Sequence, residues 1–571
     1  MIQVEQMMAD KAPAFMARSP LVTRPAVGIL RRLFHEREVN RFLQQHADSH
    51  SFDFIDRVLE HFNFTYQASQ RDRQNIPATG RVLIIANHPL GALDGLALLR
   101  LIGEIRPDVR IVANEMLMGF DQLKNLFLPV DNLKRRTPRA QLKAIGACLQ
   151  REEAVIIFPA GEVSRLSVAG VRDCKWNSSY LKLAHKNNSP LLPVHVGGRN
   201  SWLFYTSSAL YRPLAGVLLA HEMFCQKNRQ IPIRVGQTIA MEELNRLPLG
   251  TKEKNQLVRR HLYRIARGKK PLLKTEKTIA HPQNRQALRA ELKQAQRLGE
   301  TCDGKQILLL DYQEDSAVIR ELGRLREVAF RQVGEGTGQK SDIDRYDRHY
   351  RHLILWDDDD LEIAGAYRIG EAWQLLDSPG KRWIYSAELF HYSRDMTPYF
   401  EQGIELGRSF VQPRYWGRRS LDYLWYGIGA YLRAHPQVRY MFGPVSLSGK
   451  YPRLARDMIV YFYRLYFPDN ERLAKSYTSH QIADTDLDLI IPLFKGEQYE
   501  EDFNVLREQL RHLGVAVPTL YKQYSELCEA EGVRFLDFGV DADFGFCIDG
   551  LVLVDLEKLK PHKRSRYMGE G

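Results

Sequence analysis

The sequence has few cysteines, no long apolar run and no internal repeat, and each absence excludes a class of protein. Its six cysteines form no C-x-x-C pair, which is typical of reduced thiols rather than a disulfide framework or a zinc site. No stretch of about eighteen residues is uninterruptedly apolar, so we expect no transmembrane helix. The N-terminal stretch MIQVEQMMADKAPAF lacks the apolar core of a signal peptide. We therefore expect a cytoplasmic protein.

Length and charge limit the number of domains and the kinds of partner. A chain of 571 residues is too long for a single hydrophobic core, so we expect two large domains. The formal net charge of +12 favours acidic partners, which are nucleic acid, anionic lipid or an acidic carrier protein. No segment resembles a nucleic-acid-binding module. We therefore expect no nucleic acid partner, and retain the membrane surface and the carrier protein.

The spacing of apolar residues divides the chain into four parts. Residues 1–70 have helical periodicity, and residues 71–270 alternate strands with helices, which predicts an α/β domain with one central sheet. A basic linker and a helix are expected at 271–300, and a second, mixed domain at 301–571. The expected strands of the first domain are 82–86, 109–114, 154–158, 191–196 and 231–235. A helical run is expected at 119–127.

The structure expected for one apolar segment is ambiguous, and the second domain has its own expected strands and helices. The segment SWLFYTSSALYRPLAGVLLAHEMF at 201–224 is apolar but carries an Arg-Pro pair in its middle. We interpret it either as an interfacial segment lying on a bilayer or as a partly buried loop and helix. In the second domain, IYSAELF at 384–390 has the composition of a strand. A strand is also expected at 403–411, and helices at 315–333 and 420–433.

A histidine stands at the end of the first strand, in RVLIIANHPLGALDGL at 81–96. A histidine at a strand end is most often a surface residue, and an aspartate before a helix is most often an N-cap. The alternative is catalytic: His88 is suited to accept a proton near neutral pH, and Asp94 is placed to fix its tautomer and stabilise the imidazolium. Two further strand ends, at 158–165 and 193–198, carry turn residues that would line the same sheet edge.

These motifs resemble the glycerolipid O-acyltransferases of the lysophosphatidate acyltransferase superfamily. That family carries N-H-x-x-x-x-D, then F-P-E-G-T-R-S, then a V-P-V strand; this sequence has Asn87-His88 with Asp94, FPAGEVSR at 158–165 and LPV at 192–194. The gap between the histidine and the aspartate holds five residues instead of four, and Glu162 follows the glycine instead of preceding it. The resemblance covers roughly 70–245.

The resemblance implies acyl transfer to a lipid hydroxyl. His88 and Asp94 would form the catalytic pair, with His88 removing the proton of the hydroxyl as it attacks a thioester. Asn87, Glu162 and the backbone amides near Gly161 would belong to the substrate-binding set, the amides receiving the oxyanion. Arg165 and Arg136 would hold the acidic head of the acceptor, or else are solvated surface arginines.

A basic turn marks a second candidate site. The sequence QPRYWGRRSLDYLWY at 412–426 places Arg414, Gly417 and Arg419 before a helix that Ser420 would cap. Free amides at a helix N-terminus together with arginines make a phosphate cradle, although a basic surface turn has the same composition. The turn resembles the pyrophosphate loop R/Q-x-x-G-x-G/A of the GNAT N-acyltransferases, with Arg419 in place of the last small residue.

The second domain is more closely similar to acyl-homoserine-lactone synthases and ornithine-lipid N-acyltransferases. Their E-x-G/S-R strand corresponds to Glu405 through Arg408, and their acidic loop to Asp342, Asp344 and Asp347. The resemblance implies that Glu405 is the base or relay at the amine, with Arg408 in the substrate site. It implies that the acidic loop recognises a cationic amino acid, and we assign Asp344 and Asp347 to the distal ammonium. A solvated loop is the alternative, and we expect no metal there.

The two resemblances together imply a bifunctional enzyme similar to the bacterial ornithine-lipid synthases. The expected fold class is α/β in two domains, a glycerolipid-acyltransferase-like sheet domain followed by a GNAT-like mixed-sheet N-acyltransferase domain. The second domain would attach a 3-hydroxyacyl group to ornithine, and the first would O-acylate the lyso-ornithine lipid. No cofactor would be bound, and acyl carrier protein or coenzyme A would deliver the acyl group.

The same interpretation places the enzyme on the inner face of the cytoplasmic membrane, as a peripheral protein on an anionic surface. Two alternatives remain open from the sequence. One is a monofunctional phospholipid acyltransferase with a C-terminal binding module, and the other is a membrane-surface scaffold without turnover.

Overall fold

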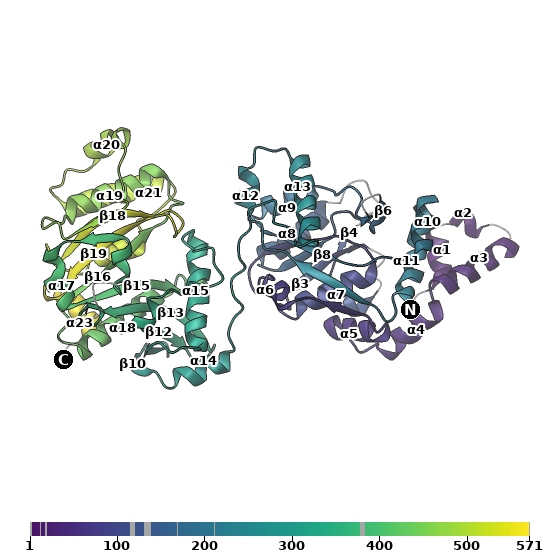
Figure 1. Ribbon diagram of the computed structural model, residues 1–571, viewed down its shortest axis with the longest axis horizontal. Helices are drawn as coiled ribbons and strands as arrows, with labels where there is room; N and C mark the ends of the chain where they lie inside the picture. Colours follow the sequence, from purple (N-terminus) through teal and green to yellow (C-terminus); the bar gives the residue numbers. More distant parts are fainter. Residues whose placement is uncertain are drawn as a thin grey trace. The chain divides into compact units, whose positions relative to one another are not determined.

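The computed structural model describes residues 3–11, 13–17, 20–114, 120–130, 139–167, 170–210, 212–376 and 383–569. The chain forms two compact units, residues 1–278 and 279–571. Figure 1 shows helices on both faces of a sheet in each unit. Within the described residues, no helix is both long enough and apolar enough to span a membrane.

The N-terminal unit contains a seven-stranded sheet of order β1-β9-β8-β2-β5-β3-β4. All its neighbouring strands are parallel except β8 and β9. The strands are β1 (Thr65–Gln67), β2 (Val82–Ala86), β3 (Val109–Asn114), β4 (Phe127–Val130), β5 (Ala154–Ile157), β8 (Leu191–Val196) and β9 (Gln230–Val235). Since β2 and β5 are neighbours, the chain segments that follow them meet at one edge of the sheet.

Strand β2 is apolar at every position because both of its faces are covered. Val82, Ile84 and Ala86 pack into the core under α5 (Ser51–His61) and α7 (Ala92–Gly103). Leu83 and Ile85 pack into the opposite core, under α8 (Arg139–Gln150), α9 (Ser179–Lys186) and α13 (Thr251–Ile265). The end of β2 is thereby held in the middle of three layers.

The C-terminal unit contains an eight-stranded sheet of order β10-β11-β12-β13-β15-β16-β19-β18. Its strands are β10 (Gln296–Glu300), β11 (Gln306–Leu310), β12 (Arg351–Asp357), β13 (Glu362–Glu371), β15 (Gly403–Val411), β16 (Tyr440–Leu447), β18 (Val533–Asp541) and β19 (Cys547–Asp555). Every pair is antiparallel except β15 and β16. One face packs on α15 (Ala317–Val333), and the other on α18 (Ser420–Ala434) and α19 (Arg453–Tyr466).

Strands β15 and β16 pair only at their beginnings and then separate. Their register runs from Gly403 and Tyr440 to Glu405 and Phe442 and stops there. A bulge in β15 opposes Tyr367 with two residues, Arg408 and Ser409, and Arg408 has a left-handed backbone with φ +49°. The separation of the strands opens a space in the sheet, which the candidate site uses.

Most expected elements form within a few residues of their predicted limits, and two expectations are wrong. Residues 384–390 do not form a strand: Tyr385–Glu388 is a 3₁₀ turn, and only Phe390–Tyr392 is extended. The expected helix at 119–127 is a 3₁₀ turn, Asp121–Leu123, followed by strand β4, and residue 119 lies outside the described residues. The ambiguous segment at 201–224 forms two helices, α10 (Trp202–Leu210) and α11 (Arg212–Cys225).

Candidate active sites

The first candidate site lies at the end of β2. The Nδ1 atom of His88 lies 3.0 Å from Oδ1 of Asp94, which is fully buried in the first turn of α7. The second oxygen of Asp94 accepts hydrogen bonds from the amides of Leu90 at 2.8 Å and Gly91 at 3.3 Å. The carboxylate therefore supports the first turn of α7 and is also the partner of the ring, and the catalytic role of the pair stays a prediction.

The surroundings of His88 strengthen it as a base. Burial of the ring lowers its pKa, but the interactions with Asp94 and the charge of Asp173 together outweigh burial, and the pKa of His88 lies above its usual value. The ring stacks on Phe158, with centroids 4.1 Å apart. Since Nδ1 is directed to Asp94, Nε2 is the nitrogen left for a substrate proton.

Backbone and side-chain bonds fix the position of the histidine segment. Asn87 donates from Nδ2 to the Val196 carbonyl and accepts from the Val196 amide, both at 2.8 Å, which ties the end of β2 to β8. The amide of Ser164 donates to the carbonyl of His88 at 2.7 Å. Asp173 accepts from the His88 amide at 3.2 Å and from the Ser164 hydroxyl at 2.5 Å. The motif at 158–165 is therefore brought against His88 as the sequence predicts.

The other predicted residues of this site have different placements. Gly161 has a left-handed φ of +67°, and its amide closes a turn by donating to the Phe158 carbonyl at 3.0 Å. That amide is therefore used within the turn instead of facing an oxyanion. Arg165 pairs with Glu162 at 2.7 Å, close to the protein surface. Arg136 lies outside the described residues.

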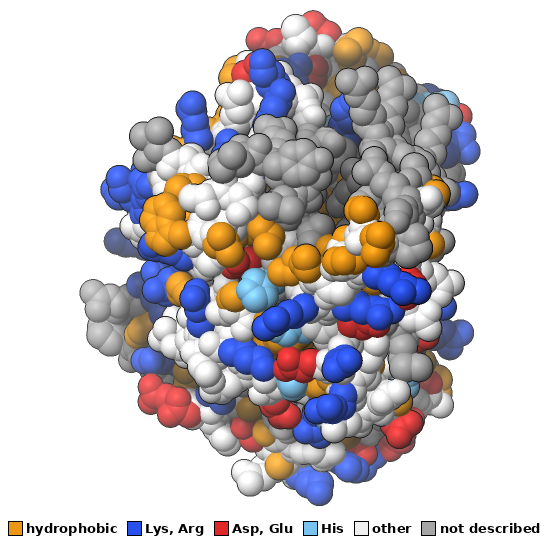
Figure 2. Space-filling view, turned by 90° about the vertical axis from the view of Figure 1, so that its right-hand side faces the viewer, with side chains coloured by type: hydrophobic (Ala, Val, Ile, Leu, Met, Phe, Trp, Pro, Cys, Tyr) orange, Lys and Arg blue, Asp and Glu red, His pale blue; other side chains and the backbone are white. Residues whose placement is uncertain are grey.

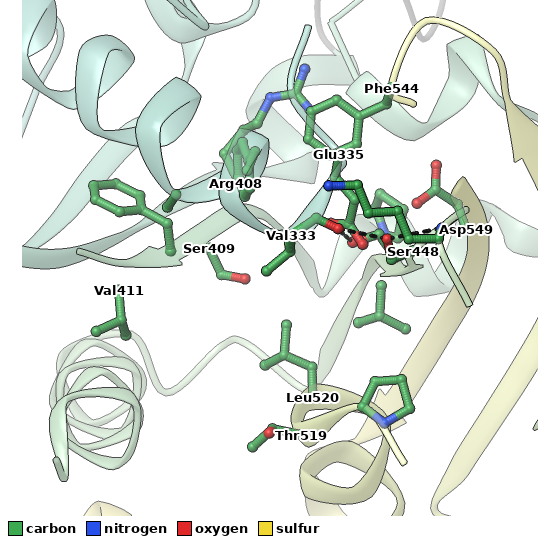
Figure 3. Close-up of a pocket in the computed structure, with 18 of the residues that line it drawn as sticks. Val333, Glu335, Arg408, Ser409, Val411, Ser448, Thr519, Leu520, Phe544 and Asp549 are labelled. Atoms are coloured by element: carbon green, nitrogen blue, oxygen red, sulfur yellow. Dashed lines mark hydrogen bonds between the residues drawn. The ribbon is translucent and has the colours of Figure 1, made fainter. Parts of the chain in front are cut away.

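The second candidate site is a cavity of about 540 Å³ in the C-terminal unit, where β15 and β16 separate. The polar side chains of Glu335, Ser448 and Asp549 lie at one end, and the apolar side chains of Val411 and Leu520 lie at the other (Figure 3). In Figure 3, Glu335 and Asp549 lie on the same side as Arg408 and Phe544, across the cavity from Leu520 and Thr519. A cavity of this size, apolar at one end and charged at the other, suits an acyl chain that meets a polar acceptor.

Arg408 lines this cavity and is joined to the acidic loop. Its guanidinium lies 3.2 Å from Oδ2 of Asp342 and 3.4 Å from Oδ2 of Asp344. Arg368, which is fully buried, lies 2.7 Å from Asp344 and 3.4 Å from Asp347. Arg326 on α15 lies 2.7 Å from Asp347. The structure brings the three predicted aspartates together, but each carboxylate already faces an arginine.

Glu405 does not line the cavity. It is 1% exposed, and its carboxylate accepts hydrogen bonds from the Tyr350 hydroxyl and from the amides of Tyr385 at 3.0 Å and Ser386 at 2.7 Å. Burial raises the pKa of Glu405, although these donors oppose the shift. In this arrangement the carboxylate holds the turn at Tyr385–Glu388 against β15, and its role as a base stays a prediction.

The basic turn before α18 borders the cavity through Trp416. Gly417 has a φ of +74°, which favours glycine, and Arg419 is exposed at the start of the helix. Arg414 lies 2.7 Å from Asp360 and 3.0 Å from Glu362, so its charge is partly neutralised. Ser420 is the first helical residue, and no side-chain cap bond is made at this end of α18.

Several residues of both sites are missed by the sequence interpretation. The missed residues, all of them buried, are Asp173, Arg326, Arg368, Glu335 and Asp549. The available signal is a charge inside an apolar run, as in FCIDGLVLV at 546–554, because a buried charge needs a partner or a function. Which partner it has depends on the sheet register, which the sequence pattern does not supply.

Comparison with known proteins matches both units of the chain. A family described as "Acyltransferase" matches residues 6–269, and an "Acetyltransferase (GNAT) domain" matches residues 325–426. The glycine Nα-acyltransferase of Phocaeicola vulgatus is 34% identical over 304 residues, which are 51% of this chain and 92% of that protein. The lyso-glycine lipid O-acyltransferase of Bacteroides thetaiotaomicron is 27% identical over 253 residues, 43% of this chain and 91% of that protein.

A third relative is named for another amino acid. The L-ornithine Nα-acyltransferase of Brucella abortus is 32% identical over 120 residues, which are 20% of this chain and 41% of that protein. The chain is thus similar both to N-acyltransferases and to an O-acyltransferase.

The pairing of Asp347 predicts a loss of stability when it is replaced by asparagine. Arg326 and Arg368 would then remain buried without the carboxylate that they share, and breaking a buried pair costs about 3–5 kcal/mol. We expect the thermal midpoint of the C-terminal unit to fall by several degrees, measured by calorimetry on the full chain. The control Asp360→Asn removes an exposed partner of Arg414 and should shift the midpoint little. Equal midpoints for the two variants would contradict the prediction.

Proposed function

The chain belongs to the same acyltransferase family as the glycine Nα-acyltransferase of Phocaeicola vulgatus, and from that premise we propose that it makes a two-chain aminolipid by two acylations. The C-terminal unit N-acylates an amino acid with a 3-hydroxyacyl group, and the N-terminal unit then O-acylates the lyso-lipid. The observation that carries the proposal is the presence of two separate candidate sites in one chain. One is the His88–Asp94 pair, and the other is the cavity between β15 and β16.

In the O-acylation, His88 acts through Nε2. The ring removes the proton of the lyso-lipid hydroxyl while the oxygen forms its bond to the thioester carbon. Asp94 stabilises the imidazolium, and the C–S bond then breaks with its electron pair on sulfur, which takes up the proton. Making the lyso-lipid and consuming it in one polypeptide limits the escape of a detergent-like intermediate.

The donor in both steps is an acyl thioester, carried by acyl carrier protein or by coenzyme A. The formal charge of +12 suits either of these acidic carriers. In the C-terminal unit, the exposed Arg419 and the amides at the start of α18 are placed to meet the donor phosphate beside Trp416. The apolar end of the cavity, at Val411 and Leu520, is placed to receive the acyl chain.

An anionic membrane surface supplies the lipid substrate of the N-terminal unit. Leu21 and Ile29 on α3 (Pro20–Leu33) are 87% and 62% exposed, and Trp202 and Leu203 on α10 are 72% and 61% exposed. Figure 2 shows hydrophobic side chains gathered in a band with lysine and arginine side chains beside it. Exposed apolar side chains next to basic ones fit the interface of an anionic bilayer.

The same helices approach the His88 site. Leu33 of α3, Phe204 of α10 and Leu218 of α11 pack in one cluster with Val163, which stands between Glu162 and Ser164 of the site motif. Lipid that enters beside α3 and α10 therefore reaches the His88 motif over an apolar surface.

Ornithine is the acceptor predicted from the sequence, and glycine is a second candidate that two observations favour. The aspartates assigned to the distal ammonium of ornithine are paired with Arg326, Arg368 and Arg408. The relative named for glycine matches 51% of this chain, and the one named for ornithine matches 20%. Glycine has no side-chain ammonium and needs no such partner.

His88→Ala should stop the second acylation and leave the first. Loss of the base lowers the rate by roughly two to four orders of magnitude, so the single-chain N-acyl lipid should accumulate. Lipid mass spectrometry of cells expressing the variant, in a host that lacks aminolipids, measures both products. His185→Ala, an exposed histidine on α9, is the matched control. Normal levels of the two-chain lipid in the His88 variant would refute the assignment.

The acceptor can be decided with purified protein. Because the acidic loop is occupied by arginines, we expect kcat/KM for N-acylation of glycine to equal or exceed that for ornithine. The assay supplies a 3-hydroxyacyl carrier protein and each amino acid in turn, and detects the N-acyl product by mass spectrometry. If kcat/KM for ornithine exceeded that for glycine tenfold or more, ornithine, the acceptor predicted from the sequence, would be the substrate.

Membrane binding should depend on the exposed side chains of α3 and α10. Replacing Leu21 and Trp202 together by glutamate removes apolar contact and adds like charge, so binding to phosphatidylglycerol vesicles should fall at least tenfold in sedimentation. Leu249→Glu changes a leucine that is 42% exposed outside these helices and serves as the control. Equal binding of both variants would place the membrane contact elsewhere.

A further inference from the structure

Two carboxylates at the polar end of the cavity have no cationic partner among the described residues. Asp549 on β19 is opposite Ser446 on β16, and the Ser446 hydroxyl donates to Glu335 at 2.7 Å. Asp549 and Glu335 are 6% and 7% exposed, and both line the cavity. Among the described residues, Asp549 accepts a weak hydrogen bond from the thiol of Cys547, at 3.7 Å to Oδ1. One oxygen of each carboxylate is therefore left for a ligand.

Burial without a cation makes these groups costly to keep ionised. Burial raises the pKa of Asp549 to about 7, with Asp541 and Glu335 adding to the shift and Arg408 opposing it. Burial also raises the pKa of Glu335, which the bond from Ser446 only partly offsets. Arg408 faces Asp342 and Asp344 as well, so it does not neutralise the cavity floor. A cationic ligand would relieve this excess of negative charge.

The substrate of the proposed N-acylation brings such a cation. An amino acid enters as an α-ammonium and has to lose a proton before its nitrogen can attack. Glu405, the base predicted from the sequence, lies outside the cavity, and its oxygens accept three hydrogen bonds. Asp549 lines the cavity at the end opposite Val411 and Leu520, where the acyl chain fits (Figure 3).

We propose that Asp549 is the catalytic base of the N-acylation and that Glu335 binds the same ammonium; the inference rests on the proposed function. Asp549 takes one proton from the ammonium, and the neutral nitrogen forms a bond to the thioester carbon. The C–S bond breaks with its electron pair on sulfur, and the nitrogen passes its second proton to the thiolate. Protonated Asp549 then returns its proton to water, which balances the reaction.

The titration of Asp549 depends on the ionisable groups around it. Each comes from a different element packed around the cavity. They are Arg408 on β15, Glu335 after α15, Lys450 after β16, Tyr385 before β14 (Phe390–Tyr392), Tyr521 on α22 (Thr519–Ser525), Asp541 on β18 and Cys547 on β19. The tyrosines stay neutral because burial raises their pKa. The carboxylates and the two basic residues set the electrostatic field at Asp549.

The test is the pH dependence of N-acylation by the purified full chain. A base has to be unprotonated, so the wild-type kcat/KM should fall as the pH falls through about 7. Asp549→Asn should lower kcat by roughly two to four orders of magnitude and remove that acid limb. Asp549→Glu should recover part of the rate. Asp543→Asn, an exposed carboxylate of the same hairpin, is the control and should keep wild-type kinetics.

Stability gives a second, independent readout. A carboxylate whose pKa is raised by folding holds more protons when folded, so its charge destabilises the fold increasingly as the pH rises. Asp549→Asn should therefore raise the thermal midpoint at pH 8 more than at pH 5, while activity is lost. A variant that is inactive but as stable as wild type or more so has not failed through misfolding.

Each outcome has a definite meaning. An Asp549→Asn variant with a rate within threefold of wild type and an unchanged acid limb would overturn the proposal. The proposal would also be overturned if Glu405→Gln removed the acid limb of the pH profile while Asp549→Asn kept it. A wild-type chain that acylates neither glycine nor ornithine would instead refute the proposed function. In that case the increase in the midpoint at pH 8 would still show whether Asp549 carries a costly buried charge.

Discussion

The separation of β15 from β16 is the constraint on which the C-terminal unit depends. Two parallel strands that pair for only three residues leave backbone groups to be satisfied elsewhere, and the bulge at Arg408 follows shortly after the last paired residue, Glu405. Gly443 allows the strands to cross closely before they part, because a Cβ there would collide with the Leu406 carbonyl. The bulge directs the guanidinium of Arg408 into the protein, where water cannot solvate it well. Its positive charge is instead balanced by Asp342 and Asp344 of the acidic loop. The aspartates at 342–347 are therefore understood first as counter-charges of the sheet.

The two sites differ in how far apart in the sequence their parts lie. His88 and Asp94 lie between the end of β2 and the first turn of α7, so a stretch of seven residues supplies the pair, and only the hydrogen bonds from Ser164 and to Asp173 come from elsewhere. The cavity of the C-terminal unit collects Glu335, Arg408, Ser446 and Asp549 from four segments. The local site is set by chain geometry, whereas the other exists only when the sheet has its full register.

This difference explains what the sequence can and cannot predict. Strands 82–86, 109–114 and 191–196 were predictable to the residue because apolar runs there are bounded by charged, proline or polar residues. The stretch at 384–390 was misassigned because Glu405, distant in the sequence, captures the amides of Tyr385 and Ser386 and bends them into a turn. His88 with Asp94 could be proposed from the sequence because the pair is local and the motif at 158–165 accompanies it. Asp549 could not, because its neighbours Glu335 and Ser446 are set by tertiary packing.

The bridge from Asn87 to Val196 has a consequence for the lifetime of the first site. It joins the end of β2 to β8 in the middle of the sheet, and amides in such central strands exchange with solvent only when the whole unit opens. The cavity of the other unit is lined in part by the seven-residue helix α22 and by the hairpin of β18 and β19, which lies at the end of its sheet. Peripheral segments of this kind open locally at lower cost. Amide exchange should thus divide the two activities of one polypeptide into a site that persists until global unfolding and a site that opens and closes far more often.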